Sequence, residues 1–409
     1  MERVVITGMG AITPVGNDVP SFWESLKTGK CGIGPITKFD VSDFKVKLGA
    51  EVKDFDPTQY MEKREARRAD ANVHYAMAAA IQAVEQAGLK EGNFDPYRTG
   101  VIFGSGVGGL HVAEQEVPKL NEKGPGRVSP FAIPEMIANI AAAYISMHFG
   151  FKGENFCPVS ACATGNHSIG EAMRAIRHGY QDVVVCGGTE NGIIPISMAG
   201  FQNMKAVHMG EDPTAASIPF DARRSGFVMG EGAGCLVLES LTHAQQRGAT
   251  ILAEVAGYGA SGDAYHITSP SPDGDAAAHA IRGAIEDAGL TPADVDYINA
   301  HGTSTPLNEK YETIAIKKAF GDEAYNVKVS STKSMTGHLL GGAAAVEAIA
   351  CVMAIREGIV PPTIGYKEPD PECDLDITPN KAVEMPVNVA NSNSLGFGGH
   401  NACILIKKV

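Results

Sequence analysis

The chain has 409 residues, a formal net charge of −13, 44% hydrophobic residues and 20% charged residues. This composition is that of a globular protein and excludes a disordered or collagen-like chain. The acidity argues against a protein that coats nucleic acid, so we expect no nucleic-acid partner. The length suits two domains, or one large α/β unit with an ample core.

The cysteines and the N-terminus favour a cytoplasmic protein. Eight cysteines are too few for a disulfide scaffold, and none forms a Cys-x-x-Cys pair. The N-terminal residues Met1–Gly8 are typical of a strand entering a glycine turn, not of a signal peptide. No run of about 18 apolar residues occurs, so we expect no membrane association. We therefore expect a cytoplasmic location with reduced thiols.

Short apolar strands alternate with alanine-rich helices along the chain. Strands are predicted at Val4–Thr7, Val101–Phe103, Val183–Cys186, Cys235–Leu238, Ile251–Tyr258, Tyr297–Asn299, Val327–Ser330, Val389–Ser392 and Ala402–Lys407. Helices are predicted at Val73–Ala87, Met136–His148, Ser168–His178, Ala276–Ala288, Tyr311–Phe320 and Ala343–Arg356. This alternation favours an α/β fold in which helices cover both faces of the sheet.

One helix end is repeated. Ala83–Leu89 recurs as Ala284–Leu290, close to half the chain further on. In both copies a glycine follows the helix, then a short polar loop and an apolar strand. We interpret the repeat as a duplicated α/β unit, with one half at residues 1–247 and the other at residues 248–409.

Cys162 lies between an extended segment, Phe156–Ser160, and the helix predicted from Ser168. A sharp turn through small residues before a helix is typical of a nucleophile elbow, here with cysteine instead of serine. The positive end of the helix dipole favours a thiolate at this position. A buried, inert thiol is the alternative, and the residues around Cys162 alone leave both interpretations open.

Two histidines follow predicted strands. His301 comes just after Tyr297–Asn299, and His338 comes after Val327–Ser330. In an open α/β sheet, ligands bind beyond the carboxyl ends of the strands, so we expect both histidines near a ligand. Their spacing from Cys162 matches no usual zinc pattern, and we predict no zinc site.

Two glycine-rich segments have different interpretations. Gly396–Gly399 surrounds Phe397 with glycines whose backbone N–H groups could bind an oxyanion, although a plain glycine turn has the same sequence. Gly104–Gly109 follows a strand and matches the dinucleotide fingerprint G-x-G-x-x-G. The segment after it is interrupted by Pro118 and leads to no second strand with a terminal acidic residue. We therefore predict no nicotinamide site.

A basic cluster stands out against the overall acidity. Glu62–Arg68 contains Lys63 and three arginines. Such a run is commonly a solvated helix face. It can also dock an acidic partner, together with Arg127 and Lys205.

The motifs around Cys162, His301, His338 and Phe397 occur together and in a fixed order. As a set they resemble the β-ketoacyl-[acyl-carrier-protein] synthases of the thiolase superfamily, and among these the synthase II group of elongating condensing enzymes. The motifs that carry the resemblance span the chain: Val5–Gly10, Ala161–Gly165, Pro219–Asp221, Gly226–Gly232, His301–Thr305, Lys333–Gly341 and Gly396–Gly399. The resemblance implies a five-layer αβαβα sandwich of two duplicated α/β halves, normally assembled as a homodimer.

The resemblance also implies a Cys-His-His site at Cys162, His301 and His338. Cys162 accepts an acyl group from acyl carrier protein, and the N–H groups of Cys162 and Phe397 hold the oxyanion. Malonyl-loaded carrier protein then loses its carboxylate, the histidines stabilise the enolate, and the carbanion attacks the acyl-cysteine. Lys333 supplies positive charge or orders the histidines, through an ion pair with Glu347.

Binding residues are implied as well, and no cofactor is required, because the phosphopantetheine arm arrives on the carrier protein. The acyl chain and this arm are expected to contact Val107, Phe201, Thr303, Thr305, Phe397 and Gly398. Acyl carrier protein is expected to dock on Arg64, Arg67, Arg68, Arg127 and Lys205. A structural sodium or potassium ion is expected at Asn299, Ala300, Glu347, Ser392 and Asn393.

Three other functions share parts of this pattern. A polyketide ketosynthase has the same site chemistry, and the sequence leaves it open. A non-catalytic chain-length partner lacks the nucleophile, so the presence of Cys162 argues against it. A degradative thiolase needs a second reactive cysteine near the C-terminus, where this chain has Gly396–Gly398.

Overall fold

The computed structural model describes residues 1–409. Its strands are β1 Val4–Ile12, β2 Gly34–Pro35, β3 Leu48–Gly49, β4 Thr99–Ser105, β5 Asn155–Phe156, β6 Val183–Glu190, β7 Gly232–Ser240, β8 Ala253–Gly262, β9 Tyr297–Asn299, β10 Lys328–Ser330, β11 Ile359–Val360, β12 Val383–Glu384, β13 Val389–Gly396 and β14 His400–Lys407. Its helices are α1 Val19–Thr28, α2 Lys63–Ala66, α3 Ala71–Ala87, α4 Leu110–Lys123, α5 Ala132–Met136, α6 Ile140–Phe149, α7 Thr164–Arg177, α8 Pro195–Asn203, α9 Leu241–Gln246, α10 Asp275–Asp287, α11 Asn308–Phe320, α12 Lys333–Thr336 and α13 Ala343–Glu357.

Each predicted strand and helix overlaps an observed one, with two corrections. The helix predicted from Met136 is split, because Ile137 has extended backbone angles that end α5 before α6 begins. Pro118 does not interrupt the chain but lies inside α4. A proline there removes the one hydrogen bond that its missing N–H would donate to the carbonyl of Glu114, and the helix continues.

Ten strands form one sheet in the order β10-β9-β13-β14-β8-β1-β7-β6-β4-β5. The order consists of two equivalent halves, β5-β4-β6-β7-β1 and β10-β9-β13-β14-β8. In each half the first three strands are parallel, and each of the last two is antiparallel to the strand before it. The halves meet at two residue pairs between β1 and β8, and the chain passes between them after α9. The predicted thiolase-like fold of two duplicated halves is confirmed.

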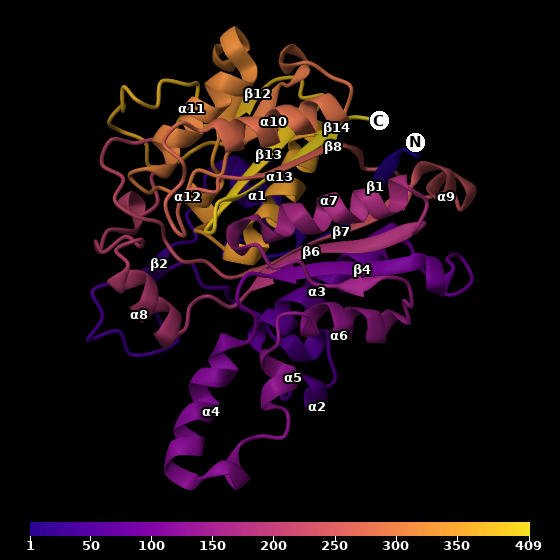
Figure 1. The fold of residues 1–409 in the computed structure, drawn as a ribbon, viewed down its shortest axis with the longest axis vertical. Coiled ribbons are helices and arrows are strands. Elements are labelled where there is room, and N and C mark those ends of the chain that lie inside the picture. The colour runs from indigo at the N-terminus through magenta and orange to yellow at the C-terminus, as the bar shows by residue number, and fades with distance from the viewer.

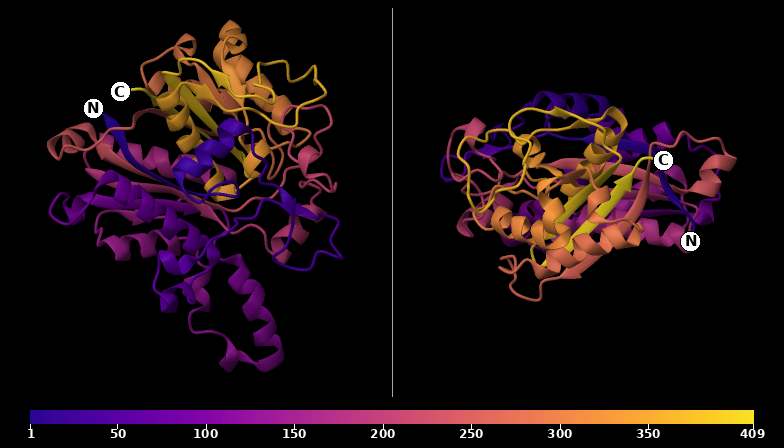
Figure 2. Two further views of the ribbon diagram at one scale, coloured as in Figure 1. Left: turned by 180° about the vertical axis from the view of Figure 1, so that it is seen from behind. Right: turned by 90° about the horizontal axis from the view of Figure 1, so that it is seen from above.

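The helices form layers on both sides of each half-sheet (Figure 1). α7 and α13 lie between the two half-sheets, and the largest apolar core, with 40 buried residues, surrounds them. α3 and α6 cover the outer face of the first half, and α10 and α11 cover that of the second. Figure 2 places the two termini close together, where β1 and β14 flank β8.

Matching glycines in the two halves let the outer helices approach the sheet. A Cβ atom at any of them would lie 2.0 Å from a helix carbonyl oxygen, so a side chain cannot be accommodated. The contacts pair Gly8 and Gly10 of β1 with Ala83 and Ala79 of α3, and Gly257 and Gly259 of β8 with Ala284 and Ala280 of α10. These helices carry the sequence repeat, which therefore has a structural cause.

None of the helices combines the length and hydropathy that a membrane span requires.

Candidate active site

Cys162 lies in a 3-10 turn, Ala161–Ala163, directly before α7. Ala161 has a φ of +50°, the left-handed region that non-glycine residues occupy at an energetic cost. This sharp turn is the predicted elbow. The helix begins at Thr164, earlier than predicted, so Cys162 lies close to the helix N-terminus.

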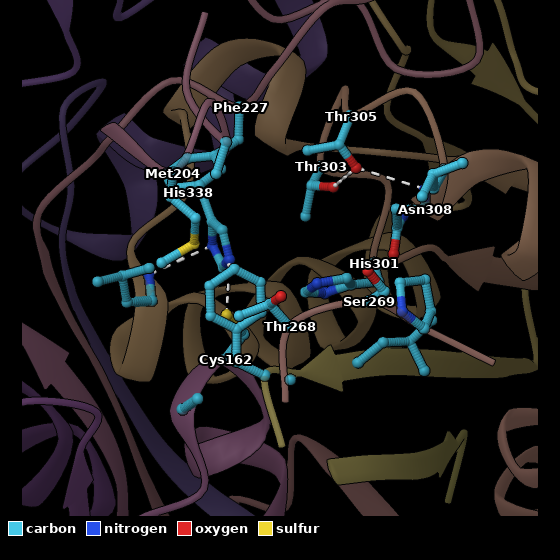
Figure 3. A pocket seen from close by; sticks show the side chains of 18 of the residues that line it. Cys162, Met204, Phe227, Thr268, Ser269, His301, Thr303, Thr305, Asn308 and His338 are labelled. Carbon is cyan, nitrogen blue, oxygen red and sulfur yellow. Dashed lines mark hydrogen bonds between the residues drawn. The ribbon is translucent and has the colours of Figure 1, made fainter. Parts of the chain in front are cut away.

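Both histidines converge on Cys162 from the second half of the molecule (Figure 3). His338 Nε2 lies 3.0 Å from Cys162 Sγ, and the ring centroids of His301 and His338 are 5.4 Å apart. All three side chains are buried, and their potential ligand atoms lie within 4.8 Å of one another. The spacing of these residues along the chain matches no usual zinc motif. Their atoms are nevertheless close together in space.

Hydrogen bonding fixes the tautomer of His338. Its Nδ1 accepts a hydrogen bond from the N–H of Leu340 at 3.3 Å, so the proton of the neutral ring lies on Nε2. Burial, followed by the nearby Lys333 charge, lowers the pKa of both His301 and His338 well below the usual value. Both rings are therefore neutral at pH 7, and His338 presents an Nε2–H donor to the reaction centre.

Lys333 is a buried residue at the start of α12, and its ammonium group forms an ion pair with Glu347 of α13. Burial raises the pKa of the Cys162 thiol to about 12, while Lys333 and the N–H groups of Phe397 and Cys162 act in the opposite direction. The helix dipole alone predicts a thiolate. In the resting site burial has the larger effect, so that prediction is corrected: Cys162 is a thiol at pH 7.

Phe397–Gly399 forms the turn between β13 and β14. Gly398 and Gly399 have φ values of +86° and +74°, which explains why these positions are glycine. The N–H of Phe397 is directed at Cys162 Sγ. The segment is thus both a glycine turn and a source of an oxyanion-type donor, the two possibilities that its sequence left open.

A cavity of about 530 Å³ opens beside Cys162. Five of the predicted contact residues line it: Val107, Phe201, Thr303, Thr305 and Phe397. Gly398 does not, because it is exposed on the outer side of the turn, against the ring of His400. The wall also includes Phe227, which packs edge-on against His338, and part of the loop 263–270, neither of which had an assigned role.

Two buried glutamates hold the backbone of the site. Glu312 of α11 accepts hydrogen bonds from the N–H groups of His301 and Gly302 at 2.7 and 2.9 Å. Glu190, at the end of β6, accepts from the glycine-rich loop after β4. Neither glutamate lies in a recognisable motif, and an isolated acidic residue gives no sign in the sequence that it will be buried.

The expected cation ligands lie at adjoining strand ends. Asn299 of β9 is in register with Ser392 of β13, and Glu347 projects from α13. Asn299 Oδ1, Ser392 Oγ and Glu347 Oε2 are buried oxygens without a hydrogen-bond partner. Buried polar atoms normally have one, and oxygen is the donor that hard cations prefer. The residues therefore fit a monovalent cation.

The expected docking residues are all exposed: Arg64, Arg67, Arg68, Arg127 and Lys205. The three arginines lie at and just after α2, and Lys205 lies at the cavity wall. Arg68 stacks on the ring of Phe131 at 4.5 Å. Within the chain, no carboxylate forms an ion pair with any of the five, so their charges are free to meet an acidic partner.

The fold and the buried Cys-His-His group define a thiolase-like condensing enzyme. Two family models match the chain: "Beta-ketoacyl synthase, N-terminal domain" over residues 1–244 and "Beta-ketoacyl synthase, C-terminal domain" over residues 252–367. The chain belongs to the β-ketoacyl synthase family, as its motifs predict.

Named relatives and solved structures match the chain over its full length. Proteins named 3-oxoacyl-[acyl-carrier-protein] synthase 2 are 53% identical in a Synechocystis strain and 47% identical in Coxiella burnetii; each match covers 100% of this chain and at least 98% of the relative. A type II polyketide ketosynthase solved in complex with its acyl-carrier protein has a TM-score of 0.93 at 34% identity, and a β-ketoacyl synthase from Burkholderia phymatum has 0.93 at 32%. Both structural matches cover 100% of this chain and at least 99% of the other.

Removing the Lys333 charge should shift the reactivity of Cys162 to higher pH. In a Lys333→Met/Glu347→Gln variant, which does not leave Glu347 as a buried carboxylate without its partner, the pKa of the thiol rises because Lys333 lowers it. Alkylation by iodoacetamide at pH 8 should slow about tenfold. The partly buried ion pair removed in Lys328→Met/Asp376→Asn lies outside the cavity, is the matched control and should leave the rate unchanged. An unaltered pH profile in the first variant would contradict this electrostatic role.

Proposed function

We propose that the protein is a 3-oxoacyl-[acyl-carrier-protein] synthase of the synthase II type, which lengthens acyl chains by decarboxylative condensation with malonyl-loaded carrier protein. The observation that carries the proposal is the His338 Nε2–H at 3.0 Å from Cys162 Sγ, with His301 beside it, at a cavity that can hold an acyl chain. Relatives carrying this name are 47–53% identical, whereas the type II polyketide ketosynthase structure is 34% identical. The polyketide alternative is therefore second.

In the first half-reaction Cys162 Sγ attacks the thioester carbonyl of the acyl carrier protein. The new C–S bond forms as the bond to the phosphopantetheine sulfur breaks, and the thiol proton leaves with that sulfur. The N–H groups of Cys162 and Phe397 stabilise the oxyanion that forms in between. Because a proton is exchanged between two thiols, a resting thiol with a raised pKa is compatible with this step.

In the second half-reaction the malonyl group loses carbon dioxide, and negative charge develops on its thioester oxygen. Neutral His301 and His338 donate hydrogen bonds to this oxygen. The carbanion attacks the acyl-cysteine carbonyl, a C–C bond forms, and the bond to Cys162 breaks. Cys162 leaves as a thiolate, and it takes up one proton from solvent to return to the resting thiol. Lys333 is held by Glu347, so its part is to keep both rings neutral and not to act as the base.

Elongation assays test the central proposal. Carrier protein loaded with acyl groups of graded length, mixed with malonyl-loaded carrier protein, should yield 3-oxoacyl products two carbons longer. Cys162→Ala should reduce the rate at least about 10³-fold, because the covalent step is lost. Cys31→Ala, at a half-buried thiol outside the cavity, is the control and should retain the rate. Repeated condensation without release would support the polyketide function instead, and no product at any length would refute both.

Docking of acyl carrier protein on the basic residues is the second part of the proposal. Arg64→Glu/Arg67→Glu should raise the KM for the carrier protein about tenfold at low salt, because opposite charges steer and hold the acidic partner. The kcat/KM for a free pantetheine thioester should not change. Lys381→Glu/Lys408→Glu makes the same change in net charge at exposed positions outside the cluster and serves as the control. An equal effect of both variants on KM would contradict a specific docking surface.

A sodium or potassium ion held by Asn299, Ser392, Glu347, Asn393 and the backbone of Ala300 is a further part of the proposal. Its support is the set of unpartnered buried oxygens, and its effect would be to stiffen the strand ends next to His301. Replacing potassium with tetramethylammonium should lower the unfolding midpoint by a few degrees, because bound ligand stabilises the native state. Ser392→Ala should reduce this salt dependence. Identical midpoints in all salts would contradict a bound cation.

We also propose a cytoplasmic homodimer. All eight cysteines are free, which suits a reducing compartment. Support for dimerisation comes from β5, an edge strand, and from the large apolar side chains that are exposed along the chain from α4 to the elbow. These are Val117, Leu120, Phe131, Ile133, Ile137, Met147, Phe156 and Val159. Sedimentation equilibrium should give twice the mass of one chain, and the mass of a single chain would contradict a dimer.

A further inference from the structure

Glu190 is a buried carboxylate, 1% exposed, whose hydrogen bonds come from two distant segments. Its Oε2 accepts from the N–H of Gly106 at 2.8 Å and of Gly341 at 3.0 Å. Its Oε1 accepts from the Ser105 hydroxyl at 2.8 Å and from the N–H of Val107 at 3.3 Å. No basic side chain pairs with it, so backbone and hydroxyl donors alone satisfy this carboxylate.

The segments that Glu190 joins form part of the cavity wall. Gly106 and Val107 lie on one segment and Leu340 on the other, and all three line the cavity beside Cys162. Glu190 itself does not reach the cavity. It fixes these wall residues from behind, at the end of β6.

Glycines are required where the segments meet around this carboxylate. A Cβ atom at Gly106 would lie 2.7 Å from Glu190 Oε2, and one at Gly341 would lie 2.4 Å from the N of Gly106. A Cβ at Gly188 would lie 2.1 Å from the carbonyl oxygen of Gly341. The contact between the two segments is therefore close and leaves little room for the wall to adjust.

The same arrangement explains the false dinucleotide fingerprint at Gly104–Gly109. The N–H groups of a glycine-rich turn after a strand form a concave anion site, which binds phosphate in dinucleotide-binding proteins. Here the Glu190 carboxylate accepts from those N–H groups. An internal carboxyl group holds the loop in the position where a ligand phosphate would otherwise do so.

We infer that Glu190 is a positioning residue that fixes Val107 and Leu340 in the cavity wall and so sets the selectivity of the enzyme for acyl chain length. The inference rests on the proposed function, because it takes the cavity to hold the acyl chain. Glu190 touches neither substrate nor the reacting atoms. It holds the two wall segments, and its charge also raises the pKa of the Cys162 thiol. The test therefore measures discrimination among chain lengths separately from the chemistry of the site.

The substitution Glu190→Gln tests this role. All four partners of Glu190 donate in this geometry, and an amide has only one acceptor oxygen, so at least one backbone N–H loses its acceptor. We measure kcat/KM for carrier protein loaded with acyl groups from hexanoyl to hexadecanoyl. The ratio between the best and poorest chain length should fall about fivefold, the size expected for one lost buried hydrogen bond. Decarboxylation of malonyl-loaded carrier protein without an acyl donor should change less than about twofold.

Ser105→Ala is a milder second variant, in case Glu190→Gln folds poorly. It removes only the hydroxyl that donates to Glu190 and accepts from the N–H of Gly108, and it should flatten the length profile in the same direction. Glu231→Gln is the matched control, because Glu231 is a fully buried carboxylate outside the cavity wall. It should lower the unfolding midpoint and leave the profile unchanged.

Two results would overturn the inference, and a third is distinct from both. An equal loss at all chain lengths in folded Glu190→Gln protein would leave Glu190 with a purely structural role. A flattened profile in Glu231→Gln would show that any buried carboxylate has this effect. If the unaltered protein condenses no acyl chain, the proposed function itself fails, and this inference fails with it.

Discussion

The close approach of α7 and α13 between the two half-sheets is the constraint on which the rest of the structure depends. At Gly165 of α7 a Cβ atom would lie 2.8 Å from the backbone N of Ala345, and at Gly234 of β7 it would lie 2.6 Å from the N of Val346. Because glycine occupies these positions, the N-terminal ends of the two helices meet at the centre of the molecule. The turn before one helix carries Cys162, and the loop before the other carries His338, so their contact follows from the packing of the helices.

Burial at this meeting point determines the charge states of the site. A group far from water loses the solvation of its charged form, which raises the pKa of the Cys162 thiol and lowers those of His301 and His338. Neutral histidines can donate hydrogen bonds to a developing enolate, and they do so without carrying a permanent charge. Lys333 reinforces this state, and its pairing with Glu347 limits the cost of burying its own charge.

The fold was predictable because its pattern is local. Apolar strands, alanine-rich helices and the repeat ending in Gly88 and Gly289 are visible in short windows of sequence, and the structure contains all of them. The convergence of Cys162, His301 and His338 was predictable only as a resemblance, since residues far apart in the chain meet through packing that no window contains. Spacing along the chain does not tell how close these residues are in space. The helix dipole alone gave the wrong charge state for the thiol, because burial depends on the whole fold.

Glycine-rich turns serve the site in two opposite ways. At Phe397–Gly399 the turn lies at the cavity and directs the backbone N–H of Phe397 at Cys162 Sγ, the atom that the proposed reaction uses. At Gly104–Gly109 the N–H groups turn away from the cavity and bind the fixed carboxylate of Glu190. The two segments have similar sequences, so composition cannot distinguish them. The difference is whether the fold places a buried carboxyl group behind the turn or leaves the N–H donors facing the cavity.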